Sequence, residues 1–558
     1  MRWVVAADEP GGSGWLRPVD EAGAPLGPAQ QVRDLAAAVA ERESAGRPRW
    51  VWPSGEDLYP DLLAACVVVE RCADLALTEA ILLGHEGQWG EPRSLGAAWA
   101  RLAGLPVPAD PAPRARAAQQ ALFEPGPPGL PGRPAPLDAA LAVHADQLRR
   151  LAAAGHPDRL RLLVAAESAS GLVAAEMSRA GVPWRADVHD VLLTEALGPR
   201  PPAGLPPRRL TELAERVADA FGHRVNPDSP GEVVQAFVRA GMPVSSARSS
   251  ELRRVDHPAV APLLAYKELA RLHAAHGWSW LDSWVCDGRF RPDWVVGGVV
   301  SGRWASRGGG ALQIPHAVRR AVVADPGHVL VVADAAQLEP RVLAALAADE
   351  RMARAAGSSD LYTALAADSF GGDRSRAKVA LLGTLYGATG GDYAPVLAVL
   401  RRRFPAAVGY VEAAARTGEE GRLVRSRLGR TCPPPSAGWR EVQERASLSG
   451  AGEPEQSRAR QAARDRGRFT RNFVVQASAA DWAAVLLAGV RRRLLGGAAQ
   501  LVFFQHDEVV VHCPEPVAGG VVTALADAAA DAGRLVFGDT PVRFPLDVAV
   551  VGCYADAK

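Results

Sequence analysis

Acidic residues stand at the ends of apolar runs in the C-terminal half of the chain. Asp334 ends a run that begins at His328, and Asp507 and Glu508 lie between two further runs, LVFFQ and VVVHC. The first pattern is typical of a strand that ends in a carboxylate, and the second of a β-hairpin with acids at its tip. Two aspartates brought together there could hold two Mg²⁺ ions, which stabilise the entering and leaving oxygens in phosphoryl transfer.

The segment after Asp334 predicts a turn followed by a helix. Pro340 fits the first helical position, where its missing N–H costs nothing, and an apolar stripe continues from Val342. Glu339, near the helix start, either favours the helix dipole or faces a bound substrate. Taken alone, the acids also have simpler roles, with Asp334 as a helix cap and the second acidic group as a solvated turn.

A second helix is predicted to begin at Arg374 and to stop at Gly387. Arg374, Lys378, Leu382 and Tyr386 recur every four residues, so they lie along one helical face. Two cations followed by an apolar ledge suit a nucleoside triphosphate, with the phosphates at one end and the base at the other. The alternative is an ordinary amphipathic helix whose cations are solvated.

Arginine is concentrated in the segments 401–403, 422–430 and 458–471. In a chain of nearly neutral charge, such clusters suggest a local groove that contacts phosphates. A surface of salt bridges is the alternative.

Composition limits the class of protein. The 558 residues include 63 Lys+Arg and 62 Asp+Glu, for a formal net charge of +1, which excludes a uniformly basic surface but not a basic cleft. The six cysteines are scattered without a C-x-x-C pair, which argues against a Cys-rich zinc site or a disulfide framework. We see no signal peptide and no apolar run near the length of a membrane span, so we expect a cytoplasmic protein.

The length predicts several domains, and composition changes along the chain. Residues 1–104 mix apolar runs with Ala-rich stretches and predict a small α/β module. Ten prolines between residues 106 and 136 indicate a linker, and residues 137–285 have mostly helical spacing. Residues 447–461 are polar, contain Gly and Arg, and predict a mobile loop.

Six motifs together resemble a family A DNA polymerase, of the DNA polymerase I type, in their order and approximate spacing. With the helical segments before them, the resemblance covers about residues 140–558. The motifs are Ser301-Gly-Arg303, Leu312-Gln-Ile-Pro315, Asp334 to Arg341, Arg374 to Gly387, Arg468 to Asp481, and His506-Asp-Glu508.

The resemblance implies a multidomain fold of α/β and α type. This is a right-hand polymerase with an antiparallel palm sheet, a helical thumb and helical fingers, preceded by a small exonuclease-like α/β domain. The implied divisions are an exonuclease-like domain at 1–104, a linker at 105–138, a thumb at 139–290, palm segments at 291–345 and 426–558, and fingers at 346–425.

The resemblance also implies roles for single residues. The metal ligands are Asp334, Asp507 and the backbone carbonyl of Ala335, for two Mg²⁺ ions that Mn²⁺ can replace. The catalytic residues are Asp334, Asp507, Glu508 and Lys378, the last as a proton donor to pyrophosphate. The nucleotide-binding residues are Gln337, Glu339, Arg374, Lys378, Leu382 and Tyr386, with Glu339 as the gate against a ribose 2′-hydroxyl. The DNA-binding residues are Arg303, Gln313, Arg341, Arg468, Asn472, Gln476 and His506.

Several positions depart from the pattern of the family. Ala335 stands where Tyr is usual, Leu382 where an aromatic residue is usual, Leu381 where Asn is usual, and Tyr362 where His is common. Ala335 would act through its backbone. The changes at Leu382 and Leu381 therefore bear on sugar discrimination, nucleotide affinity and fidelity more than on catalysis.

We therefore expect a monomeric, bacterial, nucleoid-associated DNA polymerase that extends a primer 3′-hydroxyl with dNTPs on a DNA template, in replication or repair gap filling. It would bind primer–template DNA and no membrane. The N-terminal module has no D-x-E pair, so we expect an inactive 3′–5′ exonuclease-like domain, and the chain is too short for a preceding 5′-nuclease. The alternatives are a divergent active nuclease in that module and, for the whole chain, a polymerase with relaxed sugar choice or an inactive primer–template binding protein.

Overall fold

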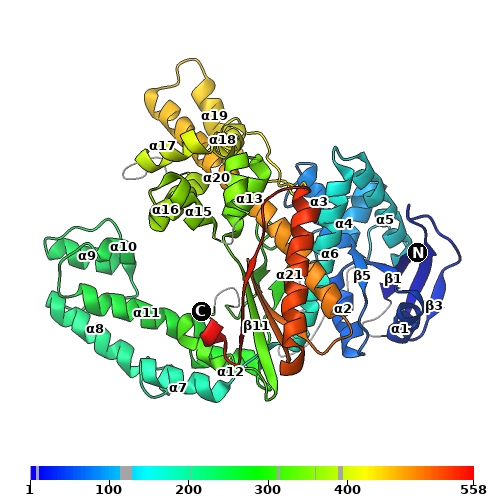
Figure 1. Cartoon of the computed structure of the whole chain (residues 1–558), viewed down its shortest axis with the longest axis horizontal. Coiled ribbons are helices and arrows are strands. Elements are labelled where there is room, and N and C mark those ends of the chain that lie inside the picture. Colours follow the sequence, from blue (N-terminus) through cyan, green and yellow to red (C-terminus); the bar gives the residue numbers. More distant parts are fainter. Residues whose placement is uncertain are drawn as a thin grey trace.

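The structure is a computed structural model that describes residues 2–7, 12–112, 129–202, 204–310, 314–357, 360–387 and 394–557. An N-terminal module lies on one side of a central sheet, and two helical lobes project from the other side (Figure 1). We call the lobe around residues 186–284 the arm and the lobe around residues 338–447 the upper lobe. This is the mixed α/β and α architecture that the sequence predicts.

The N-terminal module is built on a five-stranded sheet in the order β3-β2-β1-β4-β5. Strands β1, β4 and β5 run parallel, and β2 and β3 continue the sheet antiparallel to their neighbours. Its core is aromatic, with Trp50, Trp52 and Tyr59 buried. The elements are β1 (Arg2–Ala7), β2 (Gly14–Val19), β3 (Gln30–Val32), α1 (Leu35–Gly46), β4 (Arg49–Trp52), α2 (Gly55–Ala64), β5 (Arg71–Asp74), α3 (Leu75–His85), α4 (Leu95–Ala103) and α5 (Pro136–Ala153).

Helix α6 (Pro157–Ala180) lies between this module and the central sheet. It packs on α2 and β5 on one side and on α20 and β12 on the other. Helix α5 packs on α3, α4 and β1. Helix α5 therefore packs on the N-terminal module, and α6 joins that module to the central sheet and α20. The domain boundaries predicted from the sequence stay predictions.

The arm is a set of antiparallel helices that ends on an aromatic base. Trp280 lies 5.1 Å from Trp184 and 4.8 Å from Phe290, measured between ring centroids, and all three are buried. The elements of the arm, and of the segment that leads from it to the central sheet, are β6 (Val182–Pro183), α7 (Ala186–Leu197), α8 (Arg208–Phe221), α9 (Pro230–Arg239), α10 (Ser249–Leu252), α11 (Val260–His276), α12 (Trp278–Trp284), β7 (Val285–Cys286), β8 (Arg289–Phe290), β9 (Trp294–Val295), β10 (Ala305–Ser306) and the 3₁₀ turn η1 (His316–Ala321).

The central sheet has four antiparallel strands in the order β12-β13-β11-β14. Its inner strand β11 contains the apolar run that precedes Asp334, and residues 330–333 are fully or almost fully buried. Helices α20 and α21 pack together beside the sheet. The elements are β11 (His328–Ala335), β12 (Gln500–Gln505), β13 (Glu508–Pro514), η3 (Glu515–Val517), α21 (Ala518–Phe537), β14 (Leu546–Val551) and η4 (Tyr554–Ala557).

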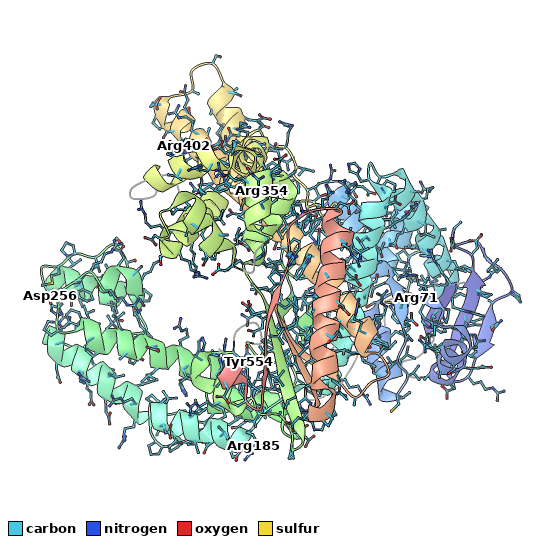
Figure 2. The ribbon with its side chains drawn as sticks, in the orientation of Figure 1. Arg71, Arg185, Asp256, Arg354, Arg402 and Tyr554 are labelled. Carbon is cyan, nitrogen blue, oxygen red and sulfur yellow. The ribbon has the colours of Figure 1, made fainter. Side chains whose placement is uncertain are left out.

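The upper lobe is helical and rests on α20, which runs from the lobe into the core (Figure 1). Arg402 in this lobe and Asp256 near the end of the arm lie far apart, on the two sides of the space in front of the sheet (Figure 2). The elements are α13 (Leu338–Ala347), α14 (Glu350–Ala355), α15 (Leu361–Ser369), α16 (Arg374–Tyr386), α17 (Ala394–Arg403), α18 (Pro405–Glu419), α19 (Ala437–Ser447) and α20 (Glu453–Leu494).

The predicted loop at residues 447–461 is wrong for most of its length, because α20 begins at Glu453. The helix start is well specified. The Glu455 side chain accepts the backbone N–H of Gly452 at 3.0 Å, and Pro454 occupies the first turn, where a missing N–H costs little. The polar composition therefore marks an exposed helix rather than a loop.

Helix α20 also corrects the expectation about apolar runs. It contains an 18-residue window with a mean hydropathy of 1.6, long and apolar enough to span a membrane, and 83% of that window is buried inside the fold. Trp482 within it is fully buried. The apolar length of α20 is therefore explained by its place as a core helix.

Candidate active site

The predicted hairpin is present, and it brings Asp507 beside Asp334. Gln505 pairs with Glu508, so His506 and Asp507 form a two-residue turn, with His506 in the left-handed region at φ 56°. Strand β11 pairs with β13 so that Asp334 lies opposite Glu508. The Ala335 N–H donates to the backbone carbonyl of Asp507 at 2.9 Å, which fixes the turn against the end of β11.

Glu508 is buried behind this pair of aspartates. Its carboxylate accepts a hydrogen bond from the hydroxyl of Tyr554 in the C-terminal turn η4. Burial, and then the charge of Glu508, raises the pKa of Tyr554 well above its ordinary value, so the hydroxyl stays a donor. The Arg319 guanidinium lies 4.7 Å from the centre of the Tyr554 ring. Sequence reasoning missed Tyr554, because nothing near residue 554 indicates contact with residue 508.

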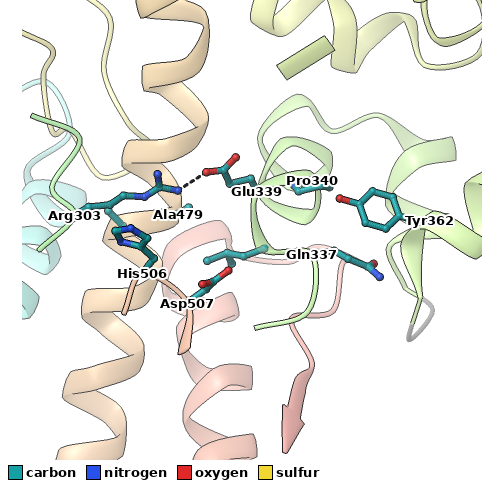
Figure 3. Close-up of a pocket in the computed structure, with 10 residues that line it drawn as sticks. Arg303, Gln337, Glu339, Pro340, Tyr362, Ala479, His506 and Asp507 are labelled. Carbon is teal, nitrogen blue, oxygen red and sulfur yellow. Dashed lines mark hydrogen bonds and ion pairs between the residues drawn. The ribbon is translucent and has the colours of Figure 1, made fainter. Parts of the chain in front are cut away.

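A pocket opens beside Asp507 (Figure 3). An ion pair between Arg303 and Glu339 crosses it, and the two side chains are mostly buried. Burial, and then the nearby Arg303 cation, lowers the pKa of His506, so this ring is neutral near pH 7. The pocket is lined by Arg303, Gln337, Leu338, Glu339, Pro340, Tyr362, Ala479, Ala480, His506 and Asp507.

Glu339 reaches the pocket because the chain turns sharply after β11. Gln337 lies in the left-handed region at φ 56° and precedes α13, which begins at Leu338. Pro340 is therefore the third helical residue rather than the predicted first. The third N–H is also among the four that have no partner within the helix, so proline remains compatible there.

Gln337 was predicted to bind the nucleotide, but its amide is bonded to the start of α15. Its Nε2 donates to Asp360 at 2.9 Å, and its Oε1 accepts the N–H of Leu361 at 2.8 Å. Gln337 lines the pocket, yet its polar atoms join the turn after β11 to the upper lobe. Sequence reasoning also missed Asp360.

The prediction that Arg341 contacts DNA is wrong. Its side chain is 0% exposed, and its guanidinium donates to the carbonyls of Ala336, Ala356 and Arg543 at 2.9, 2.7 and 3.0 Å. A charged group can be buried when its donors are satisfied in this way. Arg341 therefore holds the base of the upper lobe to the sheet.

Helix α16 forms as predicted. Asp373 caps its start by accepting the N–H of Arg376 at 3.0 Å, and Gly387 ends it at φ 72°. Arg374 and Lys378 are exposed, and Leu382 is half-buried. Arg374 donates to Asp360, and its guanidinium lies 5.5 Å from the centre of the Tyr362 ring.

The other predicted nucleotide and DNA contacts can be placed only in part. The side chain of Tyr386 and the whole of Gln313 lie outside the described residues. Arg468, Asn472 and Gln476 recur every four residues on α20, with Arg468 exposed and the other two half-buried. Arg468 forms an ion pair with Asp465, and its side chain lies against Gly387 at the end of α16. Helices α16 and α20 therefore lie against each other close to the residues that were predicted to contact the nucleotide and the template.

Five arginines of the clusters form ion pairs, which is the alternative to a phosphate-contacting groove. Surface pairs with nearby acids hold Arg401, Arg422, Arg460 and Arg468. Arg430 is buried in ion pairs with Glu167 and Asp481, so it cannot line a groove. Exposed pairs of the first kind are weak and exchange readily with other anions.

The carboxylates fit a magnesium centre. Mg²⁺ prefers oxygen ligands and keeps several waters, so one or two carboxylates together with substrate phosphates suffice to bind it. Asp334 and Asp507 supply these oxygens at one edge of the sheet. Within the described part of the chain, no group of three or more His, Cys, Asp or Glu side chains is arranged to hold a metal ion.

The N-terminal module has three pairs of adjacent acidic residues, at positions 8–9, 20–21 and 56–57. Asp8 and Glu9 lie outside the described residues. Asp20 accepts backbone N–H groups of its own turn, and Glu56 pairs with Arg307. The absence of exonuclease activity stays a prediction.

Comparison with known proteins gives a consistent assignment. Residues 207–551 match the model of DNA polymerase family A. The chain is 27% identical over 384 residues to the thermostable DNA polymerase I of Thermus thermophilus, which covers 61% of this chain and 42% of that protein. It is 30% identical over 334 residues to the corresponding protein of Thermus filiformis, which covers 53% of this chain and 36% of that protein. The chain thus spans about two fifths of the length of these relatives.

A solved structure matches the whole fold. It is the POL domain of Pol1 from M. smegmatis, in complex with DNA primer-template and dNTP. The TM-score is 0.69 at 19% sequence identity, and the match covers 100% of this chain and 95% of that one. At this identity the likeness establishes the fold.

Proposed function

Because the chain belongs to DNA polymerase family A, we propose that it is a DNA-templated DNA polymerase that extends a primer 3′-hydroxyl with dNTPs. The observation that carries the proposal is the meeting of Asp334 and Asp507 beside a pocket crossed by Arg303 and Glu339. Helix α16 supplies two exposed cations, Arg374 and Lys378, and Arg374 lies over the ring of Tyr362, which lines the pocket. This combination of oxygen ligands, cations and a small pocket suits a nucleoside triphosphate with bound metal.

Family A DNA polymerases generally use divalent metal ions. Here Asp334 and Asp507 would hold two Mg²⁺ ions, with the carbonyl of Ala335, and Mn²⁺ would be able to replace them. When bound, these ions make the primer hydroxyl more acidic and neutralise charge on the triphosphate. Glu508, tied to Tyr554, would support the arrangement from behind.

The reaction would join the primer to the incoming nucleotide, and side chains of this protein would assist it as follows. The primer 3′-hydroxyl gives its proton to solvent water, and its oxygen bonds to the α-phosphorus while the bond from that phosphorus to pyrophosphate breaks. Arg374 and Lys378 bind the triphosphate, and Lys378 gives a proton to the leaving pyrophosphate. Glu339 occupies the space that a ribose 2′-hydroxyl would need. The Glu339–Arg303 ion pair would have to adjust when a nucleotide enters, because both groups line the pocket.

We propose primer–template DNA as the partner. Arg468, Asn472 and Gln476 on α20 would follow the DNA, with Arg303 and His506 at the primer end and Gln313 beside them. The bound DNA and dNTP named for the M. smegmatis domain support this choice. We expect a monomer in the bacterial cytoplasm, acting in replication or repair.

Primer extension on a recessed duplex tests the proposal. With Mg²⁺ and the templated dNTP, the wild-type protein should add one nucleotide, and the Asp507→Ala variant should add none while still binding the duplex. The proposal fails if the wild-type protein binds the duplex but adds nothing.

The same assay with NTPs tests the gate. We expect the wild-type protein to reject NTPs and the Glu339→Ala variant to accept them. Extension of the primer by the wild-type protein with NTPs would instead favour the relaxed sugar choice that Leu382 leaves open. Shortening of the primer without dNTPs would reveal an active nuclease in the N-terminal module.

A further inference from the structure

We infer that Asp360 is a positioning residue that aims Arg374 at the triphosphate of the incoming nucleotide. It would do so by joining the turn that follows Asp334 to helix α16. This inference rests on the proposed function and deepens it, because it adds a residue outside the six sequence motifs.

Asp360 lies just before α15, and its carboxylate accepts hydrogen bonds from several different residues. One carboxylate oxygen accepts the N–H groups of Tyr362 and Thr363 at 2.9 and 3.1 Å and Nε2 of Gln337 at 2.9 Å. The other oxygen accepts the hydroxyl of Thr363 at 2.8 Å and Nε of Arg374 at 2.9 Å. A cap for α15 would need only the first two of these bonds.

The carboxylate is held in its charged form. Burial alone would raise its pKa, but the bond from Arg374 and those from Thr363 and Gln337 outweigh burial and hold the pKa of Asp360 well below its usual range. Asp360 is therefore an anion at any pH at which the protein would work, and it stays paired with Arg374.

The pairing with Asp360 leaves part of the Arg374 guanidinium available to bind a phosphate. Its side chain is 53% exposed, and it meets Asp360 through Nε while its guanidinium lies over the ring of Tyr362. A guanidinium held along one edge offers its other edge for bidentate binding of a phosphate. Asp360 and Tyr362 thus fix the plane of the cation before any nucleotide arrives, which reduces the entropy lost on binding.

The same carboxylate ties this cation to the metal-binding end of the sheet. Gln337, which donates to Asp360, lies three residues after Asp334 in the turn that precedes α13. The Oε1 of Gln337 accepts the N–H of Leu361, so the turn and the start of α15 are held by two bonds. Asp360 therefore sets the distance between the predicted metal ligands and the predicted phosphate-binding cation.

The test is nucleotide binding by the full chain with Asp360→Asn. Asparagine is as good a helix cap as aspartate, so α15 keeps its start while Arg374 loses its charged partner. The readout is the Kd of the templated dNTP on a duplex whose primer ends in a dideoxynucleotide, so no chemistry is required. We expect this Kd to rise about tenfold or more, since hydrogen bonds to charged groups are the stronger ones. The Kd for the duplex and the melting temperature should change little.

Two controls separate positioning from folding. Asp373→Asn changes the cap of α16, where the Asp373 carboxylate accepts the backbone N–H of Arg376, and should leave dNTP binding unchanged. In an Arg374→Ala background, Asp360→Asn should produce no further loss, because its effect passes through that arginine. Asp360→Ser, which also caps a helix, replaces Asp360→Asn if the latter melts early.

The outcomes are distinct. An unchanged dNTP Kd for Asp360→Asn, or a full additional loss in the Arg374→Ala background, overturns the inference. If the wild-type protein binds dNTP but does not extend a normal primer, the polymerase proposal fails while the role of Asp360 is still measured. If the wild-type protein does not bind dNTP, both are overturned.

Discussion

The free energy of unfolding should depend on a buried ion-pair network around Arg430. The Arg430 side chain donates to Asp481 at 2.9 Å and to Glu167 at 2.8 and 3.3 Å, and all three residues are buried. These residues come from the segment before α19, from α20 and from α6. The network therefore clamps the core helix that carries the predicted DNA contacts.

The network also supports the loop that carries Arg303. Gly302 has φ 85°, and a Cβ atom there would lie 2.3 Å from Nε of Arg430, so the backbone lies directly on the guanidinium. Replacing Arg430 by methionine would leave two buried carboxylates without their cation. Breaking a buried ion pair from one side costs about 3–5 kcal/mol, so we expect a loss of that size in the free energy of unfolding.

Urea unfolding followed by circular dichroism measures the loss. The matched control is Arg422→Met, which breaks an exposed pair with Glu420 and should cost less than about 1 kcal/mol. Adding Glu167→Gln and Asp481→Asn to Arg430→Met should recover part of the stability, because the unpaired charges are then gone. A loss below about 1 kcal/mol for Arg430→Met, or an equal loss for the control, would show that this buried network does not stabilise the fold.

Buried polar groups should also affect the free energy of unfolding at two other places. Tyr554→Phe removes the hydroxyl that donates to the buried Glu508 carboxylate, and it should lower the free energy of unfolding in urea by about 1–3 kcal/mol. The Kd for a primer–template duplex should not change. Unaltered stability would contradict the placement of this bond. Burial lowers the pKa of His189 and His276 to about 4, so the folded protein keeps both neutral while the unfolded chain binds protons below about pH 6.5. The free energy of unfolding should therefore fall as the pH drops from about 6.5 to 4, by up to about 3 kcal/mol per histidine, and His276→Phe should flatten that fall.

The sequence was sufficient where the signals are local. The hairpin tip at Asp507 follows from two apolar runs around three polar residues, and α16 follows from four-residue spacing with a glycine stop. Six motifs in order were sufficient for the family, because each constrains residue type and spacing together.

The sequence was insufficient where the partner lies far along the chain. Arg341 was assigned to DNA, but its partners are carbonyls at residues 336, 356 and 543, which fold around it. Tyr554 and Asp360 were missed for the same reason. The start of α20 was misread because its capping residues are polar, as those of a loop are.

We expect Asp334 and Asp507 to form the reactive centre. Asp547 provides the matched control, because it is exposed and lies directly opposite Asp334 on the neighbouring strand β14. The decisive measurement is single-nucleotide extension with Mg²⁺ by Asp334→Asn, Asp507→Asn and Asp547→Asn, with the Kd for the duplex measured in parallel. We predict that the first two variants lose extension while binding the duplex normally, and that the third retains extension. Extension by Asp334→Asn at the wild-type rate would contradict the account.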